Sequence, residues 1–395
     1  MSFSNLLELE ACPKRWALSG AQYPEIWPAS GYPRLPNLAA LRGAIVHNVI
    51  RSIAERFVLL GREGNSKIRV SQALRNLGGF TRLIGNTIEA VLQQYYCNPR
   101  ALPSLKRVHA QLHSEIPDLR VKSQELLARV NFDLYDNLGS SEDVLRSGRV
   151  TLPLSNGIYS ELELKSTDLG WHGFVDLLTL SSDFCEIRDF KAGKEKEEHI
   201  SQLHTYALLW LKDCELNPSG MPVTRLVISY LKNDIEISTP SRSDYLKLED
   251  SLKKRTERVL MSIESMPPGA NVGPDNCQFC QVRHLCDEYW DAQQKSAPKL
   301  LIDAESPFLD IQAIIVSRRG PSSWDAKVDS CYFALTEIPF LILDPAISLS
   351  MLNEGDKVRF LNVIATIEDD AADSATQPLR VSCGSRSECF ILSRI

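Results

Sequence analysis

The chain has 395 residues, a hydrophobic content of 44% and a formal net charge of -6 at pH 7, values typical of a globular protein of two or three domains. Its longest apolar runs, such as residues 340–343, are too short to span a bilayer, and its first residues lack the pattern of a signal peptide. We therefore expect a cytoplasmic protein, in which ten cysteines indicate thiols or metal ligands rather than disulfides. The negative charge gives no overall attraction to nucleic acid, although a local basic groove would be enough.

The first 147 residues are predicted to be mainly helical. Helices are expected at residues 4–20 and 38–50, joined by a packed loop rich in proline and aromatic residues. Two or three more helices are expected between residues 66 and 140, with prolines 99, 103 and 117 as breaks. Basic residues on these later helices favour a solvated face, with the wall of a nucleic-acid channel as the alternative. They are Arg100, Lys106, Arg107, Arg120, Lys122 and Arg129.

Strands and helices alternate from residue 148 to residue 292. Apolar periodicity predicts strands at residues 149–154, 159–165, 175–180, 185–191, 223–231 and 235–238, and helices at residues 195–212 and 243–266. In the second strand Glu161, Glu163 and Lys165 share a face. Ordinary surface alternation explains that pattern most simply, and a supporting role for one glutamate at a nearby site is the alternative.

Two of these strands bring charged side chains together. Side chains alternate along a strand, so Asp189 and Lys191 point the same way while Phe190 points into the core. A Ser-Ser-Asp turn joins this strand to the preceding one, which carries Asp176. The two strands can therefore bring both carboxylates and the ammonium to one point, a set that suits a hard divalent cation and an activated water.

These residues belong to three ordered motifs. They are Gly-x-x-Asp ending at Asp176, Asp-x-Lys at residues 189–191, and Gln202 with Tyr206 at i and i+4 on one face of the next helix. Asp-x-Lys alone arises constantly by chance. All three motifs, on strand, strand and helix, resemble the PD-(D/E)XK nuclease superfamily, in its RecB-like exonuclease branch. The resemblance covers residues 1 to about 290 and implies an α/β, restriction-endonuclease-like core with a mixed central sheet flanked by helices.

The resemblance also implies a set of metal ligands. His47, Asp176 and Asp189 would bind Mg²⁺ or Mn²⁺, with the carbonyl of Phe190 as a further ligand. His47 stands in Gly43-x-x-x-His47, which matches the histidine motif of RecB-like nucleases. Taken alone, His47 would be read as a half-buried structural histidine.

Catalytic roles follow from the same resemblance. Asp176 and Asp189 would act through the metal, and Lys191 would position the water or stabilise developing charge. Gln202 and Tyr206 would contact the nucleic-acid backbone or orient Lys191.

A cysteine cluster follows the predicted core. Cys277, Cys280 and Cys286 form C-x2-C-x5-C, and Cys12 is the only other cysteine in a matching context. Spacing alone does not separate an iron–sulfur cluster from a zinc site in which Cys12 or His284 is the fourth ligand. RecB-like nucleases with one cysteine before the core and three after it, such as AddB-type helicase–nuclease subunits and CRISPR-adaptation exonucleases, show this pattern. The resemblance implies that the four cysteines hold a [4Fe-4S] cluster.

The composition changes near residue 299 to short β-like runs. They are predicted at residues 308–317, 330–336, 339–343, 357–367, 379–382 and 389–392. Such runs suggest a small, OB-like barrel, an architecture that suits single-stranded nucleic acid, although its sparse aromatic residues are more simply explained as core. We therefore predict an N-terminal helical region with one half of the cluster site at residues 1–147, a nuclease core with the cysteine segment at 148–292, and a barrel at 299–395.

The motifs together predict a metal-dependent deoxyribonuclease, an exonuclease acting on single-stranded or free-ended DNA in repair or antiviral defence. The alternative is a catalytically silent DNA-binding or scaffold subunit of a helicase–nuclease or defence complex. No G-x4-G-K-[ST] occurs in the sequence, so the chain carries no recognisable ATPase motor. A separate helicase or other nucleic-acid-processing protein is therefore the expected partner.

Overall fold

The computed structural model describes residues 1–60, 65–130, 132, 153–295, 308–320, 323–331, 341–345, 352–367, 379–384 and 386–393. Contacts divide the chain into two units. The first comprises Met1–Glu10, Tyr23–Ala29 and Pro33–Glu264, and the second comprises Ala11–Gln22, Ser30–Tyr32 and Ser265–Ile395. No helix in the described ranges is long and apolar enough to cross a membrane.

The helices of the first unit pack around α3 (Leu38–Leu59). Asn37 begins this helix by accepting hydrogen bonds from the amides of Ala39 and Ala40, at 2.9 and 3.2 Å. Buried side chains recur along α3 at helical spacing and form a core with the later helices. The other helical elements here are α1 (Phe3–Ala11), α4 (Ser66–Asn76), α5 (Gly79–Leu92), η1 (Gln93–Tyr95), α6 (Leu102–Ser114) and α7 (Ile116–Leu127).

Two of the expected helix breaks are helix starts. Pro103 and Pro117 lie in the first turns of α6 and α7, where the missing amide would have no partner within the helix. Where this region is described, at residues 66–130 and 132, it contains four α-helices, α4 to α7, one more than the largest number expected.

The helix expected at residues 4–20 is also divided. It forms α1 and α2 (Pro13–Gly20), with Cys12 between them in an extended conformation at φ -164° and ψ 106°. The residue before a proline is driven out of the helical region by the proline ring, so Pro13 ends α1 and begins α2.

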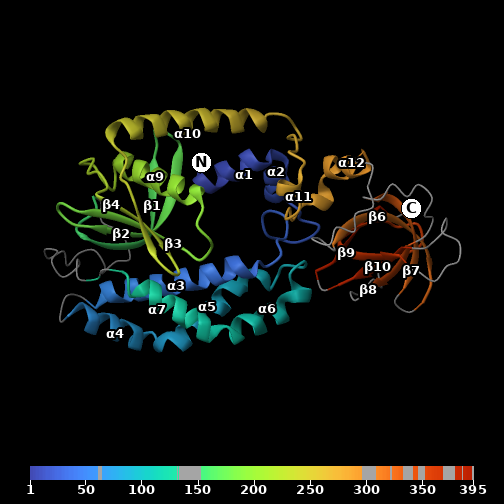
Figure 1. The fold of residues 1–395 in the computed structure, drawn as a ribbon, viewed down its shortest axis with the longest axis horizontal. Coiled ribbons are helices and arrows are strands. Elements are labelled where there is room, and N and C mark those ends of the chain that lie inside the picture. Colours follow the sequence, from blue (N-terminus) through green and yellow to red (C-terminus); the bar gives the residue numbers. More distant parts are fainter. Residues whose placement is uncertain are drawn as a thin grey trace. The chain divides into compact units, whose positions relative to one another are not determined.

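The first unit contains a five-stranded mixed sheet in the order β1-β2-β3-β4-β5. Strands β1, β2 and β3 are antiparallel neighbours, and β3 and β4 are parallel because α9 crosses between them. Figure 1 shows α9 and α10 on one side of this sheet and the layer of α3 to α7 on the other. The predicted core, a mixed sheet flanked by helices, is confirmed. Its elements are β1 (Gly157–Ser166), β2 (Trp171–Leu180), β3 (Cys185–Lys191), α9 (Glu197–Lys212), β4 (Arg225–Tyr230), β5 (Asp234–Ile237) and α10 (Arg242–Ser262).

Most of the strand predicted at residues 149–154 lies outside the described residues, as does most of the one predicted at 330–336.

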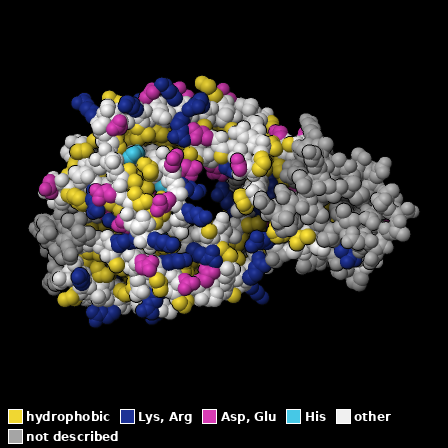
Figure 2. Space-filling model, viewed as in Figure 1, with side chains coloured by type: hydrophobic (Ala, Val, Ile, Leu, Met, Phe, Trp, Pro, Cys, Tyr) yellow, Lys and Arg dark blue, Asp and Glu magenta, His cyan; other side chains and the backbone are white. Residues whose placement is uncertain are grey.

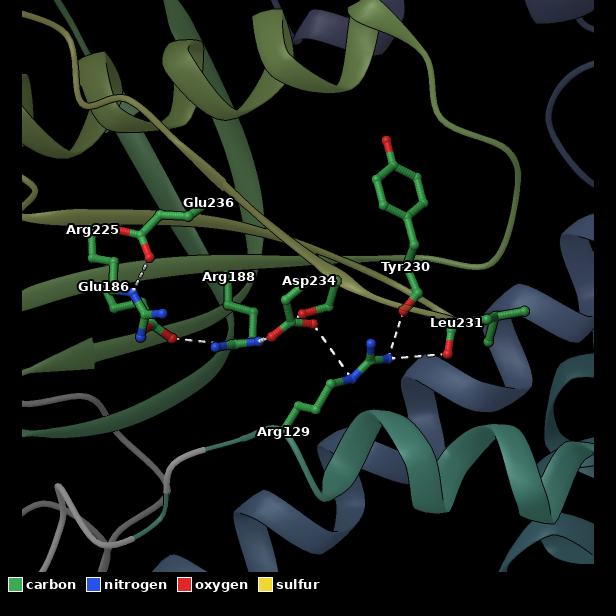
Figure 3. Close-up of polar contacts among 9 residues, drawn as sticks. Arg129, Glu186, Arg188, Arg225, Tyr230, Leu231, Asp234 and Glu236 are labelled. Carbon is green, nitrogen blue, oxygen red and sulfur yellow. Dashed lines mark hydrogen bonds and ion pairs between the residues drawn. The ribbon is translucent and has the colours of Figure 1, made fainter.

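Ion pairs of a buried arginine connect β3 to β5 (Figure 3). Arg188, with a side chain 3% exposed, pairs with Glu186 of its own strand at 3.0 Å and with Asp234 of β5. Arg129, just after α7, reaches Asp234 at 3.4 Å and donates to the backbone carbonyls of the last residue of β4 and of the residue after it. Since Arg188 alternates with Asp189 along the strand, this network supports β3 on the face opposite Asp189.

Arg129 is therefore a packing residue of the first unit. Arg100 likewise donates to the carbonyl of Pro33 at 3.2 Å. Among the other basic residues of these helices, Lys106, Arg107 and Arg120 are exposed, as both a solvated face and a channel wall require.

The second unit contains a small β-barrel. Its strands follow the order β10-β8-β7-β6-β9-β11, and an additional pairing of β10 with β9 closes five of them into a ring. Strands β8 and β10 are parallel, and the other pairs are antiparallel. A closed five-stranded ring confirms the OB-like barrel. The strands are β6 (Leu309–Arg318), β7 (Trp324–Cys331), β8 (Leu341–Pro345), β9 (Lys357–Ile367), β10 (Leu379–Cys383) and β11 (Glu388–Ser393).

The cysteine segment, residues 274–295, contacts the barrel within this unit. It contains α11 (Pro274–Cys277), η2 (Arg283–Leu285) and α12 (Asp287–Lys295). Arg283 is buried and pairs with Asp310 of β6, and Arg359 of β9 donates to the carbonyl of His284. These buried arginines tie the segment to two strands of the barrel.

Candidate active site

The strand register places the three charged motif residues together. Leu177 of β2 lies opposite Arg188 of β3, so Asp176 and Asp189 occupy the next pair of positions. The side chain of Asp176 is 17% exposed, that of Asp189 is 5% exposed and that of Lys191 is 19% exposed. Two carboxyl groups and an ammonium thus share a nearly buried position, as the sequence predicts.

Asp176 is held by the backbone of the neighbouring strand and lies beside His47. The amide of Phe190 donates to Asp176 Oδ2 at 2.6 Å. His47 Nδ1 lies 3.6 Å from the same oxygen, and its ring meets that of Phe190 edge-on. Helix α3 passes close to the chain after β3 here: a Cβ on Gly43 would be in van der Waals contact with Cβ of Ala192, at 3.5 Å.

Lys191 is positioned by a chain of polar contacts that starts on α9. Its Nζ lies 2.7 Å from Asp189 Oδ2 and donates to Gln202 Oε1 at 2.8 Å. Gln202 Nε2 in turn donates to the hydroxyl of Tyr206 at 2.8 Å. The Gln-x-x-x-Tyr pair therefore contacts the lysine, as one of its two predicted roles requires, and that role stays a prediction.

The glycine of the first motif is needed because α9 passes so close to β2. A Cβ on Gly173 would lie 2.7 Å from Cε1 of Tyr206, a distance that real Cβ contacts do not reach. The glycine therefore lets Tyr206 pack where it can contact Gln202.

Glu161 is a further residue of the site. It lies on β1 in the register position opposite Asp176, between the pairs Ser160–Leu177 and Leu162–Val175. Its backbone has φ 51°, a left-handed conformation that is costly for a residue with a Cβ and that recurs at functional sites. The sequence pattern showed Glu161 only as one of two alternating glutamates, and it contains no signal for this conformation.

The charges at the site interact strongly. Burial raises the pKa of Asp176 to about 7, with a further increase from Glu161. Burial and the neighbouring Asp176 raise the pKa of Asp189 to about 6. Burial lowers the pKa of His47, which favours the neutral imidazole that can ligate a metal. A site that resists holding two negative charges is one that a divalent cation would relieve.

The three expected ligand side chains are neighbours, but their ligand atoms do not close around one point. The ligand atoms of His47, Asp176 and Asp189 do not all lie within 4.8 Å of one another. Asp189 Oδ2 is buried and, apart from the Lys191 ion pair, has no partner among the described residues. That oxygen is what a cation would be expected to bind. The ligand role of the Phe190 carbonyl stays a prediction.

The raised pKa of Asp176 predicts an unusual dependence of stability on pH. A carboxyl group whose pKa rises from 3.8 to about 7 on folding binds its proton more tightly when folded, so folding becomes less favourable as pH increases through this range. In metal-free protein, Asp176→Asn should therefore raise the free energy of unfolding at pH 8 by roughly 2–4 kcal/mol, given about 1.4 kcal/mol per pKa unit. The gain should vanish near pH 4.

Thermal unfolding in a chelator at pH 4, 6 and 8 measures this effect. Asp183→Asn, at an exposed acid in the turn between β2 and β3, is the matched control. A gain in stability that is the same at pH 4 and pH 8 would show that Asp176 is not protonated in the folded protein.

The four predicted cysteine ligands come together in the second unit. Cys12, Cys277, Cys280 and Cys286 line one cavity, together with Arg15. Burial raises the pKa of Cys286 to about 12 and also raises that of Cys280, while Lys14 and Arg15 respectively oppose these shifts. Buried thiols beside two cations fit a group that binds thiolates.

The site thus combines two buried acids, a lysine and a histidine on a mixed sheet between helices. The model of the PD-(D/E)XK nuclease superfamily matches residues 1–287, so the chain belongs to that superfamily, whose members are nucleases that use divalent metal ions. No curated protein matches the chain.

One similar solved structure is titled "Crystal structure of SSO0001". It has 15% sequence identity, covers 52% of this chain and 85% of that chain, and gives a TM-score of 0.25.

Proposed function

We propose that the protein is a deoxyribonuclease of the RecB-like exonuclease type that depends on Mg²⁺ or Mn²⁺. The observation that carries this proposal is Asp189 Oδ2, which is buried beside Asp176 and, among the described residues, is partnered by Lys191 alone. A structural ion pair would not need a second buried carboxyl group, whereas hydrolysis at a metal does.

The proposed role of each residue follows from its position in the site. His47, Asp176, Asp189 and the carbonyl of Phe190 would hold the ion, which supplies a more acidic water and offsets charge on the phosphate. Lys191 stands against Asp189, where its ammonium can orient the attacking water or stabilise charge on the phosphoryl oxygens.

Gln202 accepts a hydrogen bond from the ammonium of Lys191 and would hold it beside Asp189. The hydroxyl of Tyr206 accepts a hydrogen bond from Nε2 of Gln202 and would fix the orientation of the Gln202 amide. Glu161, opposite Asp176, adds negative charge that strengthens cation binding.

The proposed substrate is DNA with a free end. Figure 2 shows lysine and arginine side chains spread over the visible face of the first unit, among acidic ones. Such basic side chains offer contacts for a phosphate backbone despite the acidic net charge. The strands would be separated by a distinct helicase partner, because the sequence holds no ATPase motif.

A [4Fe-4S] cluster on Cys12, Cys277, Cys280 and Cys286 is the proposed structural cofactor. No three of these sulfurs lie all within 4.8 Å of one another. Four thiolates on one zinc ion would lie about 3.8 Å apart at a Zn–S distance of roughly 2.3 Å, whereas a cluster holds its thiolates on four separate irons. The flanking Lys14 and Arg15, which oppose the raised pKa values of Cys286 and Cys280, would offset the negative charge of four thiolates.

The test is a digestion of matched DNAs by anaerobically purified protein with Mn²⁺. Linear single-stranded and double-stranded DNA should be degraded from their ends, while closed circles and linear DNA with blocked ends persist. Cleavage of circles at the same rate would replace the exonuclease with an endonuclease. If no DNA is cut with Mg²⁺ or Mn²⁺ but linear DNA is bound, the silent subunit is the correct description.

A further inference from the structure

A second group of metal-ligating side chains lies on the helical layer of the first unit. Glu89 of α5 faces His109 and His113 of α6, which are one turn apart at i and i+4. Glu89 Oε1 lies 2.7 Å from His109 Nε2 and 3.0 Å from His113 Nε2. The two imidazole rings are 4.3 Å apart between centroids and are tilted by 35°. Oε1 of Glu89 therefore lies within hydrogen-bonding distance of Nε2 of both histidines.

This cluster has a geometry that the catalytic residues lack. Its three ligand atoms all lie within 4.8 Å of one another, and among the residues that the structure describes no other group of three does so. The second oxygen of Glu89 accepts a hydrogen bond from the hydroxyl of Tyr96 at 3.2 Å. Partners of this kind fix the orientation of a metal-ligating carboxylate.

We propose that Glu89, His109 and His113 bind a zinc-type transition metal ion that joins α5 to α6. The ligand chemistry selects the class of metal. Imidazole nitrogens suit Zn²⁺, Co²⁺ and Ni²⁺, whereas Mg²⁺ and Ca²⁺ prefer oxygen ligands. This ion is therefore distinct from the cation of the nuclease site.

Little movement is needed to receive the ion. Around tetrahedral Zn²⁺, with bonds of about 2.0–2.1 Å, neighbouring ligand atoms lie roughly 3.3 Å apart. The two Oε1–Nε2 distances of 2.7 and 3.0 Å would each have to open by a few tenths of an ångström. The ion would take the place of the Nε2···Oε1 hydrogen bonds, with each neutral imidazole carrying its proton on Nδ1.

The site is open on one side. The side chains of His109, His113 and Glu89 are 40%, 35% and 49% exposed, so water or a ligand from another molecule can complete the coordination. All three belong to α5 and α6, and they lie outside every motif of the nuclease site. The ion would thus add stability to the helical layer and take no part in hydrolysis.

Cobalt substitution tests the site without any measurement of nuclease activity. Anaerobically purified, chelator-treated protein is titrated with Co²⁺ and then with Zn²⁺. The site should give weak visible absorption without the intense near-ultraviolet bands of cobalt–thiolate bonds, which would report the cysteines instead. Zn²⁺ should raise the melting temperature, by an amount that grows with the logarithm of its concentration.

The variant His109→Asn/His113→Asn should bind one ion fewer per chain and lose the Zn²⁺-dependent rise in melting temperature. His172→Asn is the matched control, because His172 also pairs with a glutamate, Glu163 at 3.5 Å, but lies outside the three-residue cluster. It should behave as wild type. Equal metal content and equal melting shifts in wild type and the double variant would overturn the proposal.

Two milder variants keep the test decisive if the double variant folds poorly. Glu89→Gln preserves size and should weaken Co²⁺ binding by at least about tenfold. Tyr96→Phe removes only the orienting hydroxyl and should weaken it by up to about tenfold, the lower end of such effects. Unchanged affinity in Glu89→Gln would show that the carboxylate is not a ligand and would overturn the site as proposed.

Discussion

Asp189→Asn protein is expected to lose Mn²⁺-dependent DNA cleavage by about ten-thousandfold or more, the scale of losses seen when one member of a catalytic unit is removed. The substitution keeps the size of a side chain that is 5% exposed, so the fold should persist. It removes the charge that the cation and Lys191 both need. Single-turnover digestion of linear DNA at saturating Mn²⁺ measures the effect.

Lys191→Met should cause a loss of similar size, and the double variant should be little worse than either single one, because the two residues act on the same water and phosphate. Asp183→Asn and Lys194→Met are matched controls at exposed positions on the same stretch of chain, and both should cleave as wild type. Persistent cleavage by highly purified Asp189→Asn protein would remove the proposed assignment of the site.

Cys12→Ser is expected to abolish the brown colour and iron content of anaerobically purified protein. Cys12 is the only one of the four cavity-lining cysteines that comes from the first part of the chain. Its loss would leave three ligands in the segment after residue 273. Because ligand binding to a site absent from the unfolded chain counts directly toward folding, proteolysis should accelerate within residues 11–22 and 265–290.

Cys185→Ala is the control, since Cys185 is a fully buried thiol of β3 outside that cavity. It should keep full iron content. Stoichiometric zinc without iron in protein never exposed to air would replace the cluster with a zinc site. A Cys12→Ser protein with wild-type iron and wild-type protease resistance would exclude Cys12 as a ligand.

The three ordered motifs allowed much of the core to be predicted from the sequence. Alternation in β3 correctly separated Asp189 and Lys191 from Phe190, and the i, i+4 spacing correctly paired Gln202 with Tyr206. These relations depend only on the local period of the backbone. They also carried the superfamily assignment, which the family match confirms.

Contacts between elements that are far apart in the sequence could not be predicted in this way. The register that puts Glu161 opposite Asp176, and its left-handed backbone, depend on how β1 pairs with β2 rather than on any local pattern. The convergence of Glu89 with His109 depends on how α5 packs against α6. The division of the first predicted helix at Pro13 was missed for a different reason. The effect of Pro13 on Cys12 is local, but the apolar periodicity of the sequence continues past it.

The second unit is discontinuous in sequence, and this has a consequence for synthesis. Residues 11–22 belong to it, but the rest of the unit, apart from residues 30–32, begins only at Ser265. A ribosome adding about 5–20 residues per second would need on the order of ten to fifty seconds to bridge that interval. The first unit can therefore fold before Cys277, Cys280 and Cys286 have been synthesised. Chains that stop before residue 286 would carry every predicted catalytic motif and still lack one of the four proposed cluster ligands, so the iron content of a preparation would report whether synthesis had run past the core.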